Sequence, residues 1–340
     1  MKEKQIKLIN RAVLIRLSYL AAFLIISITW LWFTLFQMPG KSYQGELSPL
    51  SASETALQES VQKDIQIIGA NIGKRNYSYY ENLQATASFL KSEFQNAGYT
   101  VSEQKYNIDN QTYSNLEVEI RGLKLPNEIV IIGAHYDSAF SSDGANDNGS
   151  GAAAVLELGR RFVDKKPSRT LRFVEFVNEE PPFFWTDNMG SLVYAKRCKE
   201  HQENIVAMLS LETMGYFSDR ENTQKYPFPL NYIYPSTGNF IAFIGNVKSS
   251  GFVKDVIKMF RSNAKFPSQG AALPAQIPGV GWSDQWSFWQ QGYNGLMVTD
   301  TAPFRYPYYH TQEDTPDKID YGRLSRVVYG LEQVINKLVE

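Results

Sequence analysis

Apolar runs typical of buried strands alternate with helical patterns from Glu54 to the end of the chain, and this alternation is the strongest constraint on the fold. The continuous run Glu128 to Ala134 (EIVIIGA) indicates a central strand that is covered on both faces. Strands that alternate with helices predict an α/β fold, with a mixed, mostly parallel central sheet flanked by helices on both faces. All of 54–340 is needed to complete this sheet, so we predict one soluble domain.

The other elements are predicted from apolar periodicity, helix caps and turn residues. Further strands are expected at 100–107, 113–121, 171–177, 205–211, 240–245 and 295–299. Helices are expected from Ser51 or Ser53 to about Gly69, and at 81–96, 150–163, 188–199, 251–264, 284–291 and 321–338. The segment 266–282 (FPSQGAALPAQIPGVGW) has too many Gly and Pro residues for a regular element, and we predict a specificity loop there.

The N-terminal part predicts one transmembrane helix ahead of the domain. Residues 17–36 (LSYLAAFLIISITWLWFTLF) carry no charge and are long enough to cross a bilayer. The cations that precede this run outnumber those close behind it: Lys2, Lys4, Lys7, Arg11 and Arg16 against Lys41. The positive-inside rule therefore predicts a short cytoplasmic segment at 1–16, a linker at 37–53 and a domain outside the cytoplasm. A cleaved signal peptide is the alternative, but the run ends in bulky residues without an A-x-A-like site.

Composition excludes some classes of function. The net charge of -1, without a Lys/Arg cluster on the soluble part, argues against a nucleic-acid partner. The single cysteine, Cys198, rules out an internal disulfide framework and leaves the redox compartment open. Nothing in the sequence determines the oligomeric state.

The chain has 3 histidines, and two of them lie in acid-rich segments, His135 in GAHYDS and His310 in YYHTQED. Each lies at the carboxyl end of a predicted strand or in the loop that leaves it, where open α/β sheets bind ligands. Carboxylates in equivalent positions complete the set: Asp147, Glu179, Glu180 and Glu212. Imidazole and carboxylate groups suit zinc and similar divalent ions, so we predict a metal site.

Each residue of this set has an expected role. Asp147 has two oxygens and is predicted to bridge two metals, His135 and Glu212 to complete one, and Glu180 and His310 the other. Asp137 is placed to accept the second ring N–H of His135. Because adjacent side chains in extended backbone point opposite ways, Glu179 is predicted to face the attacking water as general base.

Five segments resemble the metal-binding segments of the M28 family of zinc aminopeptidases: GAHYDS, GANDNGSGAAAVLEL, VNEEPPFF, LSLETMGY and YYHTQEDTPDKID. The resemblance extends over about 60–340 and includes a GKR segment at 73–75. It implies a co-catalytic two-zinc centre that releases amino-terminal residues from peptides, with the same five ligands and with Glu179 as base. It also implies a cis peptide bond between Asp147 and Asn148. Many relatives have Asp where this chain has Glu212, and the longer side chain is expected to shift the second metal or weaken its binding.

Other residues leave alternatives open. The insertion 181–185 (PPFFW) is predicted to form a pocket wall, and Trp185 lies where the related glutaminyl cyclases, which keep one zinc, carry a tryptophan near the substrate. Asp284 is either a helix N-cap or a substrate contact. Arg305 could bind a substrate carboxylate or form a loop ion pair.

The sequence thus predicts a membrane-anchored, outward-facing zinc aminopeptidase that acts on peptides. The alternatives are a single-zinc glutaminyl cyclase and an inactive binding domain on the same fold. The sequence does not reveal which amino-terminal residue of the substrate is preferred, because the loops that would form the pocket have no predicted position.

Overall fold

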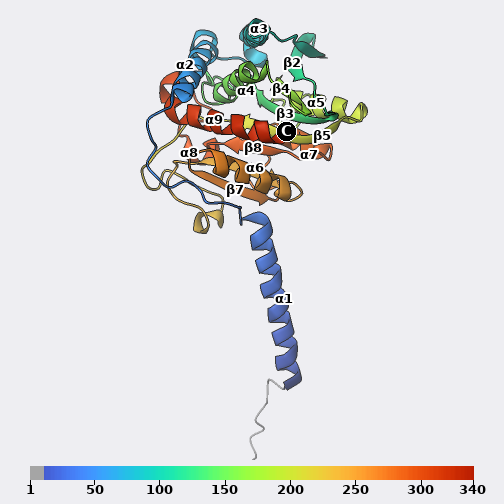
Figure 1. Ribbon diagram of the computed structural model, residues 1–340, viewed down its shortest axis with the longest axis vertical. Coiled ribbons are helices and arrows are strands. Elements are labelled where there is room, and N and C mark those ends of the chain that lie inside the picture. Colours follow the sequence, from blue (N-terminus) through green and yellow to red (C-terminus); the bar gives the residue numbers. More distant parts are fainter. Residues whose placement is uncertain (1–10) are drawn as a thin grey trace, which may run out of the picture.

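The computed structural model describes residues 11–340, so Lys2, Lys4 and Lys7 of the predicted cytoplasmic segment lie outside the described residues. A long N-terminal helix projects from an α/β domain that contains the rest of the chain (Figure 1). This helix, α1 (Arg11–Leu35), is the one described helix that is long and apolar enough to cross a membrane, and none of its residues is buried.

The domain is built on one eight-stranded sheet with the order β1-β2-β4-β3-β5-β8-β6-β7. The four central strands β4, β3, β5 and β8 are parallel, whereas β2 and β6 each run antiparallel to their neighbour in this central group. The strands are β1 (Ser102–Ile108), β2 (Gln111–Ile120), β3 (Leu125–His135), β4 (Arg169–Phe176), β5 (Asn204–Glu212), β6 (Ile241–Asn246), β7 (Ser268–Leu273) and β8 (Leu296–Thr299). The predicted mixed, mostly parallel sheet is confirmed.

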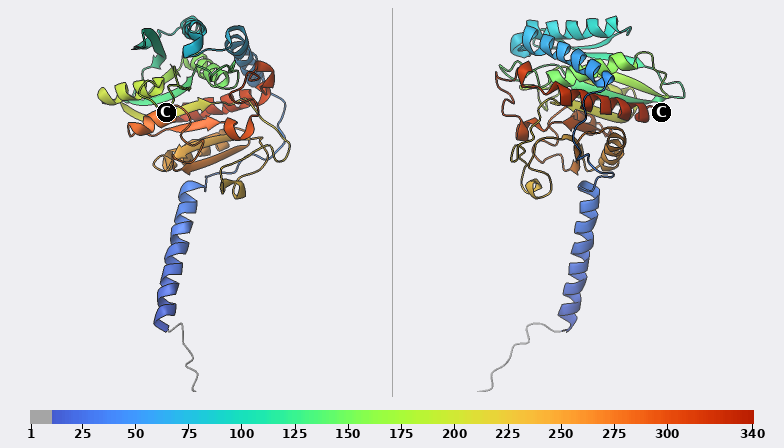
Figure 2. Two further views of the ribbon diagram at one scale, coloured as in Figure 1. Left: turned by 180° about the vertical axis from the view of Figure 1, so that it is seen from behind. Right: turned by 60° about the vertical axis from the view of Figure 1, so that its left-hand side comes forward.

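Helices cover both faces of the sheet, as predicted, and the two faces bury separate apolar clusters. Helices α3, α4 and α6 pack against one face, with α2 and α9 packed on these helices, and α5 and α7 pack against the other face (Figure 2). The α-helices of the domain are α2 (Ala52–Gln66), α3 (Tyr80–Asn96), α4 (Gly149–Phe162), α5 (Gly190–Glu200), α6 (Ser250–Asn263), α7 (Gln285–Gln290), α8 (Ala302–Arg305) and α9 (Tyr321–Leu338). Short helical turns η1 (Ile67–Ile72), η2 (Tyr77–Tyr79), η3 (Leu230–Tyr232) and η4 (Pro316–Lys318) complete the list.

Local sequence signals explain several of these boundaries. Ser51 is the N-cap of α2, and its side chain and that of Glu54 form a reciprocal capping box. The turn between β1 and β2 places Asp109 and Asn110 at positive φ, which these two residue types tolerate better than most.

The prediction that 266–282 has no regular element is wrong for its first part, because β7 lies there. The sequence of β7, SQGAAL, has low strand propensity. The strand forms because β6 pairs with it in parallel along its whole length and α6 packs against it. Both contacts join segments that the local pattern does not connect.

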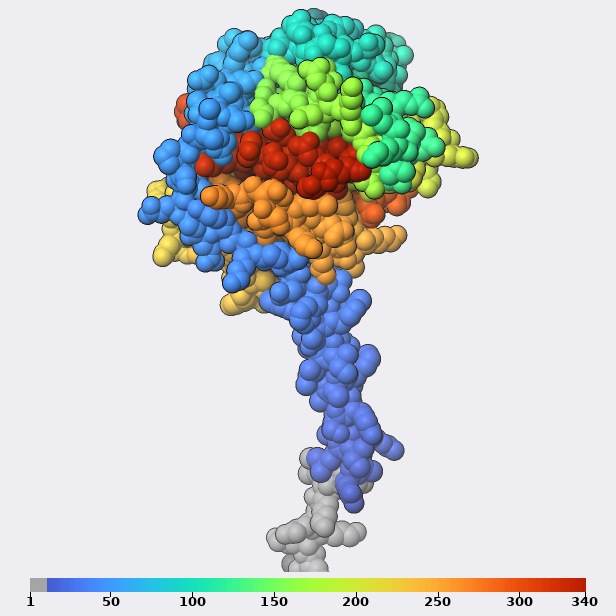
Figure 3. Space-filling model, in the orientation of Figure 1, coloured from blue at the N-terminus to red at the C-terminus, as the bar shows by residue number. Residues whose placement is uncertain are grey.

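The segment 37–53 has no regular structure ahead of α2, but it is tied to the domain. Met38 is buried, Arg261 donates to the carbonyl oxygens of Pro39 and Gly40, and the Ser42 hydroxyl accepts from the Ser268 N–H. In the space-filling view the segment runs along the side of the domain from α1 toward α2 (Figure 3). These contacts fix where α1 leaves the domain.

Candidate metal centre

The parallel direction of β3, β4 and β5 brings the predicted site residues to one edge of the sheet. His135 is the last residue of β3 and Glu212 the last residue of β5, while Glu179 and Glu180 follow the end of β4. Asp147 lies in the loop that enters α4, and its peptide bond to Asn148 is cis, as the family resemblance implied. His310, the one member of the set that is not buried, lies in the loop after α8 and is about a quarter exposed.

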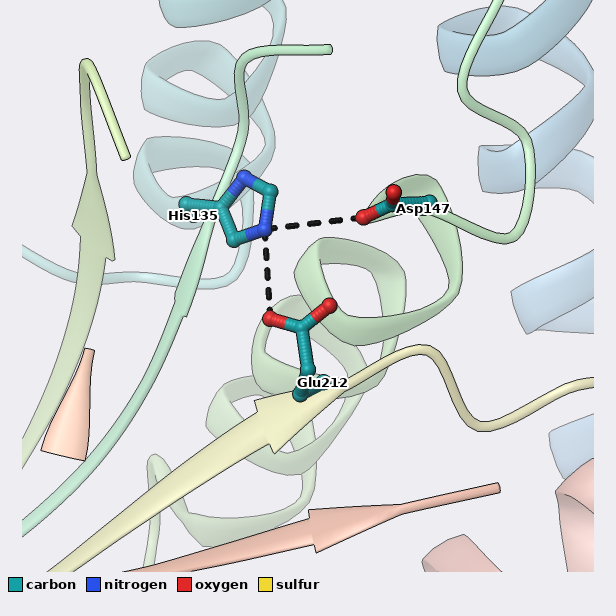
Figure 4. Close-up of side chains that lie close together, drawn as sticks. All are labelled: His135, Asp147 and Glu212. Carbon is teal, nitrogen blue, oxygen red and sulfur yellow. Dashed lines mark ion pairs between the residues drawn. The ribbon is translucent and has the colours of Figure 1, made fainter. Parts of the chain in front are cut away.

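The first donor group contains His135, Asp147 and Glu212 (Figure 4). His135 Nε2 lies 3.2 Å from Glu212 Oε2 and 3.7 Å from Asp147 Oδ1. Burial alone would lower the pKa of His135, but the carboxylates of Glu212 and Glu179 outweigh it and raise that pKa well above its usual value.

The second donor group contains Asp147, Glu180 and His310. His310 Nε2 lies 3.0 Å from Asp147 Oδ2 and 3.4 Å from Glu180 Oε1. Asp147 therefore directs one oxygen at each histidine. Burial of the Glu180 carboxylate raises its pKa to about 7, and the negative charge of Asp147 adds to this effect.

The separations and the missing hydrogen bonds of the donor atoms suit a bound metal ion better than direct contacts between the side chains. Asp147 Oδ2 and Glu180 Oε1 are buried and make no hydrogen bond within the described residues. Ligand atoms about 2.1 Å from one tetrahedral zinc lie about 3.4 Å apart, close to the separations in both groups. A buried excess of carboxylates over imidazoles is costly unless a cation neutralises it.

Asp137 holds the two acidic residues after β4 in position. Its Oδ1 lies 3.4 Å from His135 Nδ1, the ring nitrogen that faces away from the donor group. The same carboxylate accepts the backbone N–H of Glu179 through Oδ1 and that of Glu180 through Oδ2, each at 3.1 Å. The Asp137 side chain thus links the orientation of His135 to the backbone of Glu179 and Glu180. The sequence predicted only the contact with His135.

Four polar side chains that support the site have positions that sequence reasoning missed. Ser283 donates to Glu212 Oε2 at 2.6 Å, and Asn148 donates to the carbonyl oxygen at the end of β5. Asp314 accepts the N–H groups of Asn146 and Asp147, and the Tyr309 ring stacks on His310 at 3.8 Å. Tyr309 and Asp314 lie within the YYHTQEDTPDKID segment and Asn148 directly follows Asp147, so proximity in sequence to predicted ligands was the signal available for these three.

The structure places the three tentative substrate contacts differently. Trp185 is 43% exposed, stacks on Trp286, and donates through Nε1 to the Gly281 carbonyl. Asp284 is fully buried and makes no capping hydrogen bond to α7; burial raises its pKa to about 7. Arg305 is buried and donates to Gln224 and to the Phe240 carbonyl. Because these donations hold Arg305 inside the fold, we leave it out of the proposed substrate site.

An apolar pocket adjoins the donor groups at Glu212 and Tyr309. Its floor is the face of β6, β7 and β8 that carries Ala242, Ile244, Ala271, Leu273 and Met297. Alternate residues of the same strands, such as Ile241 and Phe243, face the main core, so the pocket lies on the opposite side of the sheet. Two loops form most of its walls: 224–234 and the predicted specificity loop, which contributes residues 277–282.

A parallel sheet with buried imidazole and carboxylate donors at its carboxyl edge, beside an apolar pocket, defines a metal-dependent enzyme of the α/β class. The sequence matches the model of Peptidase family M28 over residues 115–335. The chain therefore belongs to this peptidase family, and the expected resemblance is confirmed.

Individual proteins support the family and the fold. The chain is 32% identical over 290 residues to the protein YfbL of Escherichia coli. This match covers 83% of this chain and 88% of YfbL. Its fold resembles that of a zinc aminopeptidase from Bacillus subtilis, with a TM-score of 0.65 and 16% identity over 83% of this chain and 95% of the other. A glutaminyl cyclase from Fimbriiglobus ruber is also similar, with a TM-score of 0.62 and 18% identity over 86% and 97%.

Proposed function

We propose that this chain is a membrane-anchored aminopeptidase with a co-catalytic two-zinc centre, formed by His135, Asp147, Glu180, Glu212 and His310. The observation that carries the proposal is the position of Asp147, whose two oxygens face two different histidines, each accompanied by a glutamate. A bridging carboxylate of this kind is typical of two-metal hydrolytic sites. Zinc, when bound, would polarise the scissile carbonyl and lower the pKa of a water molecule.

Glu179 is the proposed general base. Its Oε2 lies 3.8 Å from His135 Nε2, and it forms a further possible donor group with His135 and Glu180, of which Glu180 also supplies a donor to the second group. Burial raises the pKa of Glu179 well above the usual value, which moves it toward the range useful for proton transfer near neutral pH. Glu179 would take a proton from the attacking water and deliver it to the leaving amine.

The acidic surroundings favour release of amino-terminal residues over internal cleavage. A substrate α-ammonium group would meet Glu179, Glu180 and Asp147, whereas an internal peptide bond brings no cation to this end of the site. Trp185 is half-exposed and accessible to the substrate. Asp284 is buried and would affect the electrostatic potential of the site from inside the fold.

The apolar pocket is the proposed site for the first side chain of the substrate. It adjoins Glu212 and Tyr309, and aromatic and aliphatic side chains line it, so it suits a large apolar residue. Polar side chains would lose water there without regaining hydrogen bonds. We therefore expect amino-terminal leucine or phenylalanine to be preferred over charged residues.

Filling the pocket floor tests this preference. The variant Ala271→Leu adds bulk at a buried floor position of β7. We expect kcat/KM for amino-terminal phenylalanine to fall about 10–200-fold, with a much smaller change for amino-terminal alanine, because each misplaced methylene costs about 1–3 kcal/mol in such a pocket. Steady-state kinetics with the two substrates measure the ratio. Equal losses for both would count against this pocket as the specificity site.

The proposed architecture joins one membrane span to one catalytic domain. Residues 54–340 form the proposed catalytic domain, 37–53 the connection, and α1 a single transmembrane span with its N-terminus in the cytoplasm. The absence of any buried residue in α1 supports a role outside the domain core, since a core helix of this length would bury one face.

The fold resembles both an aminopeptidase and a glutaminyl cyclase. One assay distinguishes these two activities. The purified full-length protein, dialysed against zinc, is tested for bound zinc, for release of free amino acids from unblocked peptides, and for cyclisation of amino-terminal glutamine. About two zinc ions per chain with amino-acid release is the expected result. One zinc with cyclisation would reassign the chain, and metal without either activity would leave a binding role.

A further inference from the structure

The loop at residues 226–234, here called the aromatic loop, exposes two rings at its tip. Phe228 and Tyr232 are 82% and 79% exposed, more than any other large apolar side chain in residues 37–340, and they contact each other edge to face. The base of the loop is well packed, because Leu230 is buried and the Tyr234 hydroxyl donates to the Gly270 carbonyl at 2.8 Å. The tip is therefore held out from a fixed base.

The aromatic loop lies beside the end of α1. The ring of Phe36, directly after α1, lies 6.4 Å from that of Tyr234, and both belong to one apolar cluster with Leu230. Lys254 on α6 donates to the Phe33 carbonyl in the last turns of α1 at 2.7 Å. The ribbon views agree that the loop reaches down to the level at which α1 enters the domain (Figures 1 and 2).

The last turns of α1 mark the depth of a membrane surface. Trp30 and Trp32 are exposed on this part of the helix, and tryptophan and tyrosine prefer the interface between hydrocarbon and water. Lys254 contacts the last turn of the helix and Lys41 follows the helix in sequence, so cations lie at the level where lipid headgroups would be. A bilayer spanned by α1 therefore ends at the height of the aromatic loop.

We propose that the aromatic loop rests in the interfacial layer of the bilayer that α1 spans, with Phe228 and Tyr232 among the lipid headgroups. The inference depends on the part of the proposed function that makes α1 a membrane anchor. It goes further, because a second contact prevents the domain from pivoting on a single helix. The same loop contributes Tyr226, Leu230 and Tyr234 to the apolar pocket, so the contact also holds this pocket next to the membrane surface.

The position of the loop can be measured with a fluorescent label on the full-length protein. Cys198, the native cysteine, is fully buried, and burial raises the pKa of its thiol to about 12, so it does not compete for a thiol-reactive dye. The variants Tyr232→Cys and Phe228→Cys receive an environment-sensitive dye. Ser102→Cys is the matched control, since Ser102 is exposed on β1, at the sheet edge opposite to β7.

The labelled proteins are reconstituted in vesicles of phosphatidylcholine and phosphatidylglycerol that carry a nitroxide on the headgroup or in the middle of the acyl chain. We expect a blue-shifted emission at positions 228 and 232, with strong quenching by the headgroup nitroxide and weaker quenching by the mid-chain one. The dye at position 102 should stay unquenched. Retained peptidase activity in each variant shows that the protein is folded.

Three other outcomes would overturn the proposal in distinguishable ways. In the first, the dye at 228 and 232 emits as it does in water and is not quenched, while the protein resists alkaline extraction from the vesicles. This result would support the anchor and refute the loop contact. A blue shift that lipid does not quench and that dilution abolishes assigns the loop to a second copy of the chain. Extraction of the whole protein by alkali refutes the anchor itself, and the loop contact with it, but leaves the peptidase proposal standing.

Discussion

Replacing Glu179 by Gln is expected to lower kcat by about 10²–10⁴-fold, the contribution of a positioned general base. Glutamine keeps the shape of the side chain but cannot accept a proton from water. Because His135, Asp147, Glu180, Glu212 and His310 are unchanged, the bound zinc should stay at the wild-type level. Steady-state kinetics and metal analysis on the same preparation measure both quantities.

The control for this prediction is Glu221→Gln, at an exposed position without an ion pair or hydrogen bond among the described residues 11–340. It carries the same chemical change away from the site and should leave kcat and zinc content unaltered. Near-normal activity in Glu179→Gln would remove Glu179 from its proposed role. Loss of zinc along with activity would make Glu179 a ligand instead, which its distance of 3.8 Å from His135 Nε2 also permits.

Replacing Asp147 by Ala is expected to have the largest effect on metal binding, because this residue supplies a donor to both groups. Zinc should fall from about two per chain to less than one. Loss of metal stabilisation worth several kcal/mol would lower kcat/KM by about 10³-fold or more. Without the Asp147 carboxylate, His135 and His310 lose the side chain that supplies an oxygen to both donor groups.

Metal analysis by mass spectrometry and zinc titration of the metal-free protein check this prediction. Asp164→Ala changes an exposed aspartate just beyond α4 and should bind zinc as the wild type does. Comparing Glu212→Ala with Glu180→Ala adds a finer test, since each should weaken one of the two sites. A protein that keeps about two zinc ions without Asp147 would refute the bridging role.

Most regular elements were predictable because their signals are local. Apolar runs marked β3, β4 and β5, and helical periodicity with caps or glycine stops marked α2, α3 and α9. The donor residues were predictable for a related reason. In a parallel sheet, residues at the carboxyl ends of different strands converge, so knowing the strand ends was enough to bring His135 and Glu212 together.

The features that were missed depend on contacts between distant segments. Strand β7 has weak local propensity and forms through its pairing with β6. The sequence left Arg305 as either a substrate contact or a loop ion pair, yet its guanidinium donates to Gln224 and to the Phe240 carbonyl, more than sixty residues away in sequence. The two N–H bonds that Asp137 accepts join the end of β3 to the turn after β4.

The sequence by itself determined the fold class and the family, and it predicted which residues would meet at the candidate metal centre, because these depend on residue type, periodicity and spacing along the chain. Only the tertiary structure decided that Asp147 directs its two oxygens at different histidines and that an apolar pocket opens beside Glu212. It also decided that the aromatic loop stands beside α1. The physical reason is that side-chain direction, loop position and burial are set by long-range packing, which no local pattern specifies.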